Sequence, residues 1–191
     1  HIDDASDYLD VARLYLDIYL PQADIRVGRQ SIYWGSAAFL NPTDPFPELL
    51  AAEPWRPRRG TNAIRAHVPI GDRVDLTLVL GSDDAFTAVR AAGRLRTTFA
   101  EADIAIIGAY RGDDASTLVG FDLRGTFGVG YWLEVATTNQ AWDQPDLAIG
   151  MDYSFPVLDS LVLMAQYYRH GRGQPAPDPL ASLHSALAGN Q

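Results

Sequence analysis

The chain has 191 residues, no cysteine and a formal net charge of −9 at neutral pH. This length allows one large domain or two small ones, and 47% hydrophobic residues exclude an unfolded chain. Without cysteine the chain has no disulfides and no thiolate metal sites. The acidic charge makes nucleic acid a poor partner, because phosphates require a basic surface. No run of about 18 apolar residues occurs, so the sequence predicts no transmembrane helix.

Apolar residues recur at every second position along most of the chain, which is the period of a β-strand with two different faces. In the first such segment, Leu14, Leu16 and Ile18 alternate with Tyr15 and Asp17. The last segment fits least well, because it is apolar on both faces at first. We expect about ten strands, in residues 13–20, 24–30, 64–70, 73–80, 94–99, 103–110, 119–124, 129–135, 147–155 and 161–170.

The connections between these segments alternate in length. Short ones lie near residues 21–23, 70–72, 100–102, 125–128 and 156–160, and long ones near 34–60, 82–92, 112–116 and 139–146. Short turns at one end and long loops at the other are typical of an outer-membrane barrel. Aromatic residues near the expected strand ends suit interfacial girdles: Tyr19, Phe99, Tyr110, Tyr153, Phe155 and Tyr167.

The expected fold class is therefore all-β, an antiparallel transmembrane β-barrel. One row of each strand is almost free of charge in mid-strand, which suits lipid, and the other row carries the charges, which suits a watery lumen. A soluble sandwich explains the alternation equally well. It does not explain strands of about nine or ten residues, the sorted loop lengths or the aromatic positions.

A short motif adds a family resemblance. The chain reads Val27-Gly28-Arg29-Gln30, then Trp34-Gly35, then Asn41-Pro42-Thr43-Asp44. This series resembles porin-like outer-membrane proteins of Gram-negative bacteria, including uncharacterised barrels and relatives of the alginate-export type. The motif covers about thirty residues, and Arg58–Ile70 is similar in style. The resemblance implies a bacterial outer-membrane location and carries over no functional residue.

We expect residues 1–191 to form one domain, a single β-barrel segment. A complete member of such a family usually ends on a strand with a terminal aromatic, and this chain ends in Ala186-Leu187-Ala188-Gly189-Asn190-Gln191. We therefore expect the strands to be part of a larger barrel. Residues 34–60 are expected to form a long loop that constricts the lumen or packs on the rim, and residues 171–191 a loop or tail.

Two groups of charged residues are candidates for the transport path. The rows opposite the apolar ones are expected to line a pore, or alternatively to pair across strands and fill the lumen: Asp24, Arg26, Arg65, Arg73, Asp75, Arg94, Arg96, Asp122, Arg124, Glu134 and Asp152. The long loop supplies the candidate constriction residues: Glu48, Glu53, Arg56, Arg58 and Arg59.

Other chemistry has weak support. The four histidines have no metal-ligand spacing, and the acid pairs Asp83-Asp84 and Asp113-Asp114 lack the spaced ligands of a calcium loop, so no metal or cofactor is expected. The Gly-x-Ser-x-Gly motif is absent, and Gly128-Val129-Gly130 has no third glycine. We therefore expect no catalytic residues and no enzyme activity.

The function predicted from the sequence is a porin-like channel for small hydrophilic solutes, or an exporter of a polar polymer. The alternatives are a non-conducting structural or assembly barrel, a soluble all-β protein, and an outer-membrane hydrolase. Outer-membrane lipid, lipopolysaccharide and the solute are the expected partners, with no nucleic acid, and homo-oligomerisation stays open.

Overall fold

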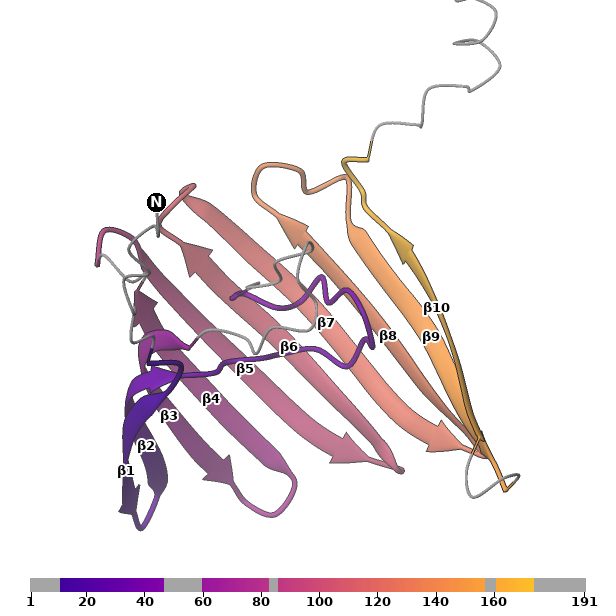
Figure 1. The fold of residues 1–191 in the computed structure, drawn as a ribbon, viewed down its shortest axis with the longest axis horizontal. Helices are drawn as coiled ribbons and strands as arrows, with labels where there is room; N and C mark the ends of the chain where they lie inside the picture. The colour runs from indigo at the N-terminus through magenta and orange to yellow at the C-terminus, as the bar shows by residue number, and fades with distance from the viewer. Residues whose placement is uncertain (1–10, 47–59, 83–85, 157–160, 174–191) are drawn as a thin grey trace, which may run out of the picture.

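The computed structural model describes residues 11–46, 60–82, 86–156 and 161–173. In these ranges the chain forms ten β-strands and no helix (Figure 1). The described residues therefore contain no helix that could span a membrane. The strands are β1 (Leu14–Leu20), β2 (Ala23–Gln30), β3 (Thr61–Ile70), β4 (Val74–Ser82), β5 (Val89–Phe99), β6 (Ala102–Arg111), β7 (Ser116–Phe127), β8 (Val129–Thr138), β9 (Asp146–Phe155) and β10 (Leu161–Arg169).

All ten strands belong to one antiparallel sheet, in which neighbours in sequence are neighbours in space. β1 and β10 form its two edges and do not pair with each other, so the sheet is open (Figure 1). The prediction of an all-β antiparallel fold with about ten strands is confirmed. Closure into a barrel is not seen in the residues that the structure describes.

The connections have the predicted alternation. Residues 21–22, 71–73, 100–101 and 128 form short turns, whereas the described parts of the other connections, residues 31–46, 86–88, 112–115 and 139–145, have no strand and belong to longer links between strands. Because successive connections of an antiparallel meander lie at opposite ends of the sheet, most of the short turns share one end and the long loops share the other. The turn between β3 and β4 holds Arg73, which is exposed and lies outside the strand face where the sequence predicted it.

The cross-strand register gives the sheet two chemically different faces. Residues directly opposite each other on antiparallel strands point to the same side. One such row runs Leu16, Val27, Ile64, Leu80, and we call this side the apolar face. The other row begins with Asp17, Arg26 and Arg65, and we call this side the charged face.

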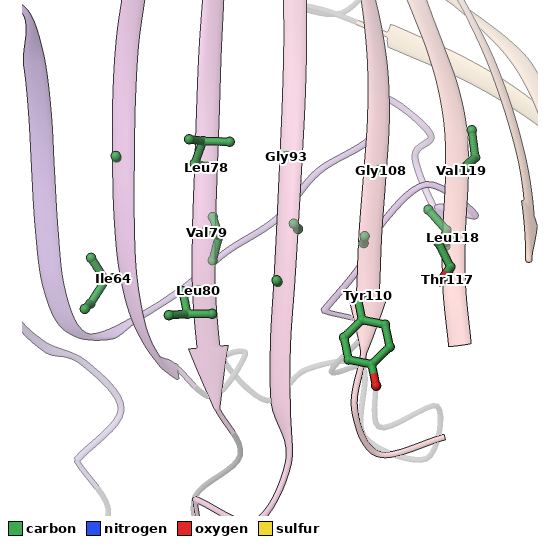
Figure 2. Close-up of a pocket in the computed structure, with 14 residues that line it drawn as sticks. Ile64, Leu78, Val79, Leu80, Gly93, Gly108, Tyr110, Thr117, Leu118 and Val119 are labelled. Carbon is green, nitrogen blue, oxygen red and sulfur yellow. The ribbon is translucent and has the colours of Figure 1, made fainter. Parts of the chain in front are cut away.

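The apolar face is exposed across the whole sheet. Leu14 on β1, Ile106 on β6 and Leu163 on β10 are 71%, 58% and 55% exposed. Near the centre, Gly93 of β5 lies opposite Gly108 of β6, and this lack of side chains leaves a shallow apolar depression of about 600 Å³ (Figure 2). An apolar surface of this extent is rare on a monomer in water and marks a contact with another apolar phase or partner.

The hydrophobic core lies on the opposite side, against the charged face. Residues 31–46, which follow β2, fold over that face and bury Ile32, Trp34 and Phe46. The strands make room for these large side chains with small ones, mainly alanine. The core is thus formed between one sheet and one irregular segment, not between two sheets as in a sandwich.

Replacing Gly28 with alanine is expected to loosen β1 from the sheet. Gly28 has a φ of +126°, and a Cβ atom there would overlap the carbonyl oxygen of Leu14 on β1. An alanine in a backbone conformation and a space that only glycine fits lowers the free energy of unfolding by more than about 1 kcal/mol. Backbone amides of β1 should therefore exchange with deuterium severalfold faster in the variant. Gly108→Ala is the matched control, because a Cβ atom there meets nothing within 4 Å. Equal exchange in the two variants would contradict this account.

Candidate functional site

Residues 31–46, which we call the inner segment, cross the charged face from β2 toward β8 (Figure 1). The segment has no regular secondary structure, yet Trp34 and Phe46 are only 5% and 1% exposed. Its backbone polar groups cannot all pair with one another, so the sheet must supply hydrogen-bond partners. Most of these partners come from two side chains, Glu134 of β8 and Gln166 of β10.

Glu134 is the main attachment point of the inner segment. One carboxylate oxygen, Oε1, accepts the backbone N–H groups of Ser36 and Ala37, both at 2.6 Å. The other, Oε2, accepts the Thr43 hydroxyl at 2.7 Å and the Thr43 N–H at 3.2 Å. Glu134 is fully buried. A buried carboxylate is stable only when its oxygens are hydrogen-bonded, and these four donors meet that need.

Two glycines allow this close approach. Gly35 has a φ of +101°, and a Cβ atom there would lie 2.7 Å and 2.8 Å from the Glu134 oxygens. Gly120 of β7 faces Thr43, whose Cγ2 would be 3.0 Å from a Cβ atom at that position. The Trp34-Gly35 pair in the sequence therefore has a structural reason: only glycine leaves space for the carboxylate.

The end of the inner segment is a compact turn. Asp44 donates its N–H to the carbonyl oxygen of Asn41 at 3.2 Å, and the Asp44 side chain accepts the N–H of Phe46 at 3.1 Å. The Asn41 amide donates to the carbonyl oxygen of Trp34 and to the hydroxyl of Tyr33. These bonds give Asn41-Pro42-Thr43-Asp44 one defined shape, in which Thr43 reaches Glu134.

One glutamine fixes the strand from which the inner segment starts, and another bonds the segment itself. Gln30 is fully buried at the end of β2, and its amide donates to the carbonyl oxygen of Ala63 at 3.0 Å. Gln166 accepts the N–H groups of Ala38 and Phe39 at 2.8 Å and 3.2 Å. The inner segment thus continues from β2 and is hydrogen-bonded to β8 and β10.

Most of the predicted pore-lining residues lie together on the charged face. Their positions follow from the strand register: Asp24, Arg26, Arg65, Asp75, Arg94, Arg96, Asp122, Arg124, Glu134 and Asp152. The predicted constriction residues lie outside the described residues: Glu48, Glu53, Arg56, Arg58 and Arg59. Tyr19, expected in an aromatic girdle, is instead on the charged face opposite Asp24.

Some of these charges form ion pairs within the face. Arg26 binds Asp17 through two contacts of 2.5 Å and 2.9 Å, and its guanidinium lies 3.9 Å from the centre of the Tyr15 ring. Arg96 binds Asp75 at 2.9 Å. Cross-strand pairing, the alternative reading of the charged rows, therefore accounts for part of the set.

A polar pocket of about 450 Å³ lies on the charged face. Strands β1 to β5 and the start of the inner segment form its walls. It is lined by Asp17, Tyr19, Asp24, Ile25, Arg26, Tyr33, Trp34, Arg65, His67, Asp75, Thr77, Arg94 and Arg96. We call it the arginine pocket, because four of these side chains are guanidinium groups.

The acid pairs of the loops do not form a metal site in the part of the chain that is described. Asp113 binds Arg90 at 2.9 Å, and Asp114 accepts the N–H of Ser116 at 3.0 Å. Hydrogen bonding from the Ser116 side chain holds the pKa of Asp114 below its usual value. Within the described ranges, no group of three or more His, Asp or Glu side chains could hold a metal ion. Asp83 and Asp84 lie outside these ranges.

No known family model matches the chain, and no curated protein or solved structure is significantly similar to it. The resemblance to porin-like families therefore stays a prediction. The structure nevertheless gives a physical role to the residues that carried the resemblance: Gly35, Asn41 and Thr43 position the inner segment, Gly28 allows the close contact of β2 with β1, and Gln30 bonds β2 to β3.

Sequence reasoning missed the roles of Glu134 and Gln166. Glu134 was predicted to line a pore, but its carboxylate is occupied by the inner segment. The sequence predicted only that this stretch belongs to a long loop that constricts the lumen or packs on the rim. Nothing local could identify the partner, because Glu134 is 98 residues after Ser36.

Replacing Glu134 with alanine is expected to release the inner segment. The change leaves three backbone donors and one hydroxyl without an acceptor, and bonds to a charged group are worth about 1.5–3 kcal/mol each. The amides of Ser36, Ala37 and Thr43 should then exchange with deuterium at least tenfold faster, since tenfold corresponds to about 1.4 kcal/mol. Asp152→Ala, on the same face of β9, is the control. Unchanged protection in Glu134→Ala would refute the role of this carboxylate.

Proposed function

We propose that this sheet forms part of the wall of a porin-like channel in the bacterial outer membrane, through which small hydrophilic solutes pass. The observation that carries the proposal is the contrast between the two faces. The apolar face carries exposed large side chains on nine of the ten strands and half-buried ones on β8, while the opposite face carries the charges and the inner segment. Lipid outside and water inside is the environment that suits such a sheet.

Strand length and aromatic placement support the same proposal. Most strands have nine to twelve residues, close to the roughly 9–11 needed to cross a bilayer. Phe99 and Phe127 are exposed at the ends of β5 and β7, next to short turns, and Phe155 is exposed at the C-terminal end of β9. Tyr110 and Tyr167 are exposed near the opposite ends of β6 and β10. Two aromatic bands on one face suit the two membrane interfaces.

An open sheet cannot remain in lipid, because the unpaired backbone groups of its edge strands would lack partners. The proposed channel therefore needs further strands between β1 and β10. The inner segment would then lie inside the lumen and narrow it, with its polar backbone bonded to Glu134 and Gln166.

A barrel whose lumen is blocked is the second candidate, and the inner segment is the observation that favours it. Ser36, Ala37 and Thr43 of this segment are bonded to Glu134 of β8, and Thr43 lies against Gly120 of β7. In a structural barrel the inner segment would block the lumen permanently. A channel would leave a path beside it, and the arginine pocket is open space of that kind.

The membrane part of the proposal is tested by Ile106→Arg with Ile106→Ala as the control. Ile106 is exposed at the middle of β6 on the apolar face. Arginine on a lipid-facing site costs about 2–4 kcal/mol near the midplane. Ile106→Arg should therefore lower membrane insertion and the urea midpoint in vesicles far more than Ile106→Ala. In a water-soluble protein an exposed arginine would be tolerated and would improve solubility, which is the opposite result.

The channel part is tested by conductance across a planar lipid bilayer. We expect discrete, ohmic current steps for the full-length protein, and larger or noisier steps for Glu134→Ala, because releasing the inner segment widens the path. Ile106→Ala, on the apolar face, serves as the control and should leave the current steps unchanged. A correctly inserted protein that never conducts, even with Glu134→Ala, would favour the structural barrel.

A further inference from the structure

The geometry points to the arginine pocket as a binding site for small organic anions, with a carboxylate held by Arg65 and Arg94. This inference rests on the proposed function in one respect, since it names the class of solute that the channel would carry. The chain as a whole has a net charge of −9, so the sign of the pocket is opposite to that of the protein.

The first argument is the charge count of the lining. The pocket has four arginines and three aspartates. Arg26 is occupied by Asp17 and the Tyr15 ring, and Arg96 is occupied by Asp75. Among the described residues this leaves one aspartate outside an ion pair, Asp24, against two guanidinium groups.

The second argument is that the guanidinium groups of Arg65 and Arg94 are not engaged in ion pairs. Neither Arg65 nor Arg94 has a carboxylate within ion-pair distance in the described part of the chain, and the Nε atom of Arg94 is buried with no hydrogen-bond partner there. A guanidinium presents five N–H donors in a planar fork that matches a carboxylate. A partly desolvated guanidinium without an acceptor favours an anionic ligand over a neutral one.

The third argument is the wall opposite the arginines. Tyr33 and Trp34 of the inner segment line the same pocket. Trp34 is held in place by the hydrogen bond from Asn41 and by the attachment of Ser36 and Ala37 to Glu134. An aromatic edge beside a cationic site suits a ligand that has a compact apolar or aromatic body and one carboxylate. A volume of about 450 Å³ is ample for such a solute.

The test is calorimetric titration of the full-length protein in neutral detergent micelles with sodium benzoate. Benzamide, the neutral analogue, and benzamidinium, the cationic one, are titrated in parallel. We expect benzoate to bind at least tenfold more tightly than either. Arg65→Gln and Arg94→Gln should each weaken benzoate binding about tenfold, and the double variant should abolish it. Arg94→Lys, which keeps the charge and loses the planar fork, should fall between the wild type and Arg94→Gln.

Arg90→Gln is the matched control, because Arg90 lies on the charged face of β5 and binds Asp113 outside the pocket. Its benzoate affinity should equal that of the wild type. Equal binding of benzoate and benzamide, tighter binding of benzamidinium, or benzoate binding that survives the double variant would each overturn the assignment. The readout does not depend on conduction. Benzoate binding with silent bilayers would therefore support the site and refute the channel, and conduction without benzoate binding would do the reverse.

Discussion

A single buried carboxylate, that of Glu134, joins the inner segment to the sheet, and the core of the described structure depends on this contact. Four donors from Ser36, Ala37 and Thr43 surround its two oxygens. Without them, burying the charge would be strongly unfavourable. Without the carboxylate, the donors of an irregular segment would lie unpaired beside small apolar side chains. The large side chains Trp34 and Phe46 are buried because the segment is held there.

This arrangement explains why the two faces of the sheet differ so strongly. The charged face is covered in part by the inner segment, so it can combine a small apolar core with ion pairs and a polar pocket. The apolar face has no such cover among the described residues, and its large side chains remain exposed. This contrast between the faces suits an apolar surrounding on one side and water on the other, and it is the physical basis of the proposed membrane channel.

The charged face is not electrically uniform. Arginines gather on β2, β3 and β5 around the pocket, whereas the acids Asp122 and Glu134 lie on β7 and β8, beside the inner segment. The inner segment therefore has two roles in the proposal. It uses one acid of the face, Glu134, as its anchor, and it contributes an aromatic wall to the cationic pocket. In the proposed channel, the position of the inner segment would therefore set both the width of the path and the shape of the anion site beside it.

The sequence by itself determined the strands, their two faces and the alternation of short and long connections, because period two and turn residues are local signals. It also placed Arg26, Arg65, Arg94 and Arg96 correctly on one face. Only the tertiary structure decided what those charges do. Whether a carboxylate such as Asp17 pairs with an arginine, or Glu134 binds backbone N–H groups, depends on contacts between residues far apart in the chain. The path of the inner segment was decided in the same way, because irregular backbone takes its shape from the acceptors that surround it.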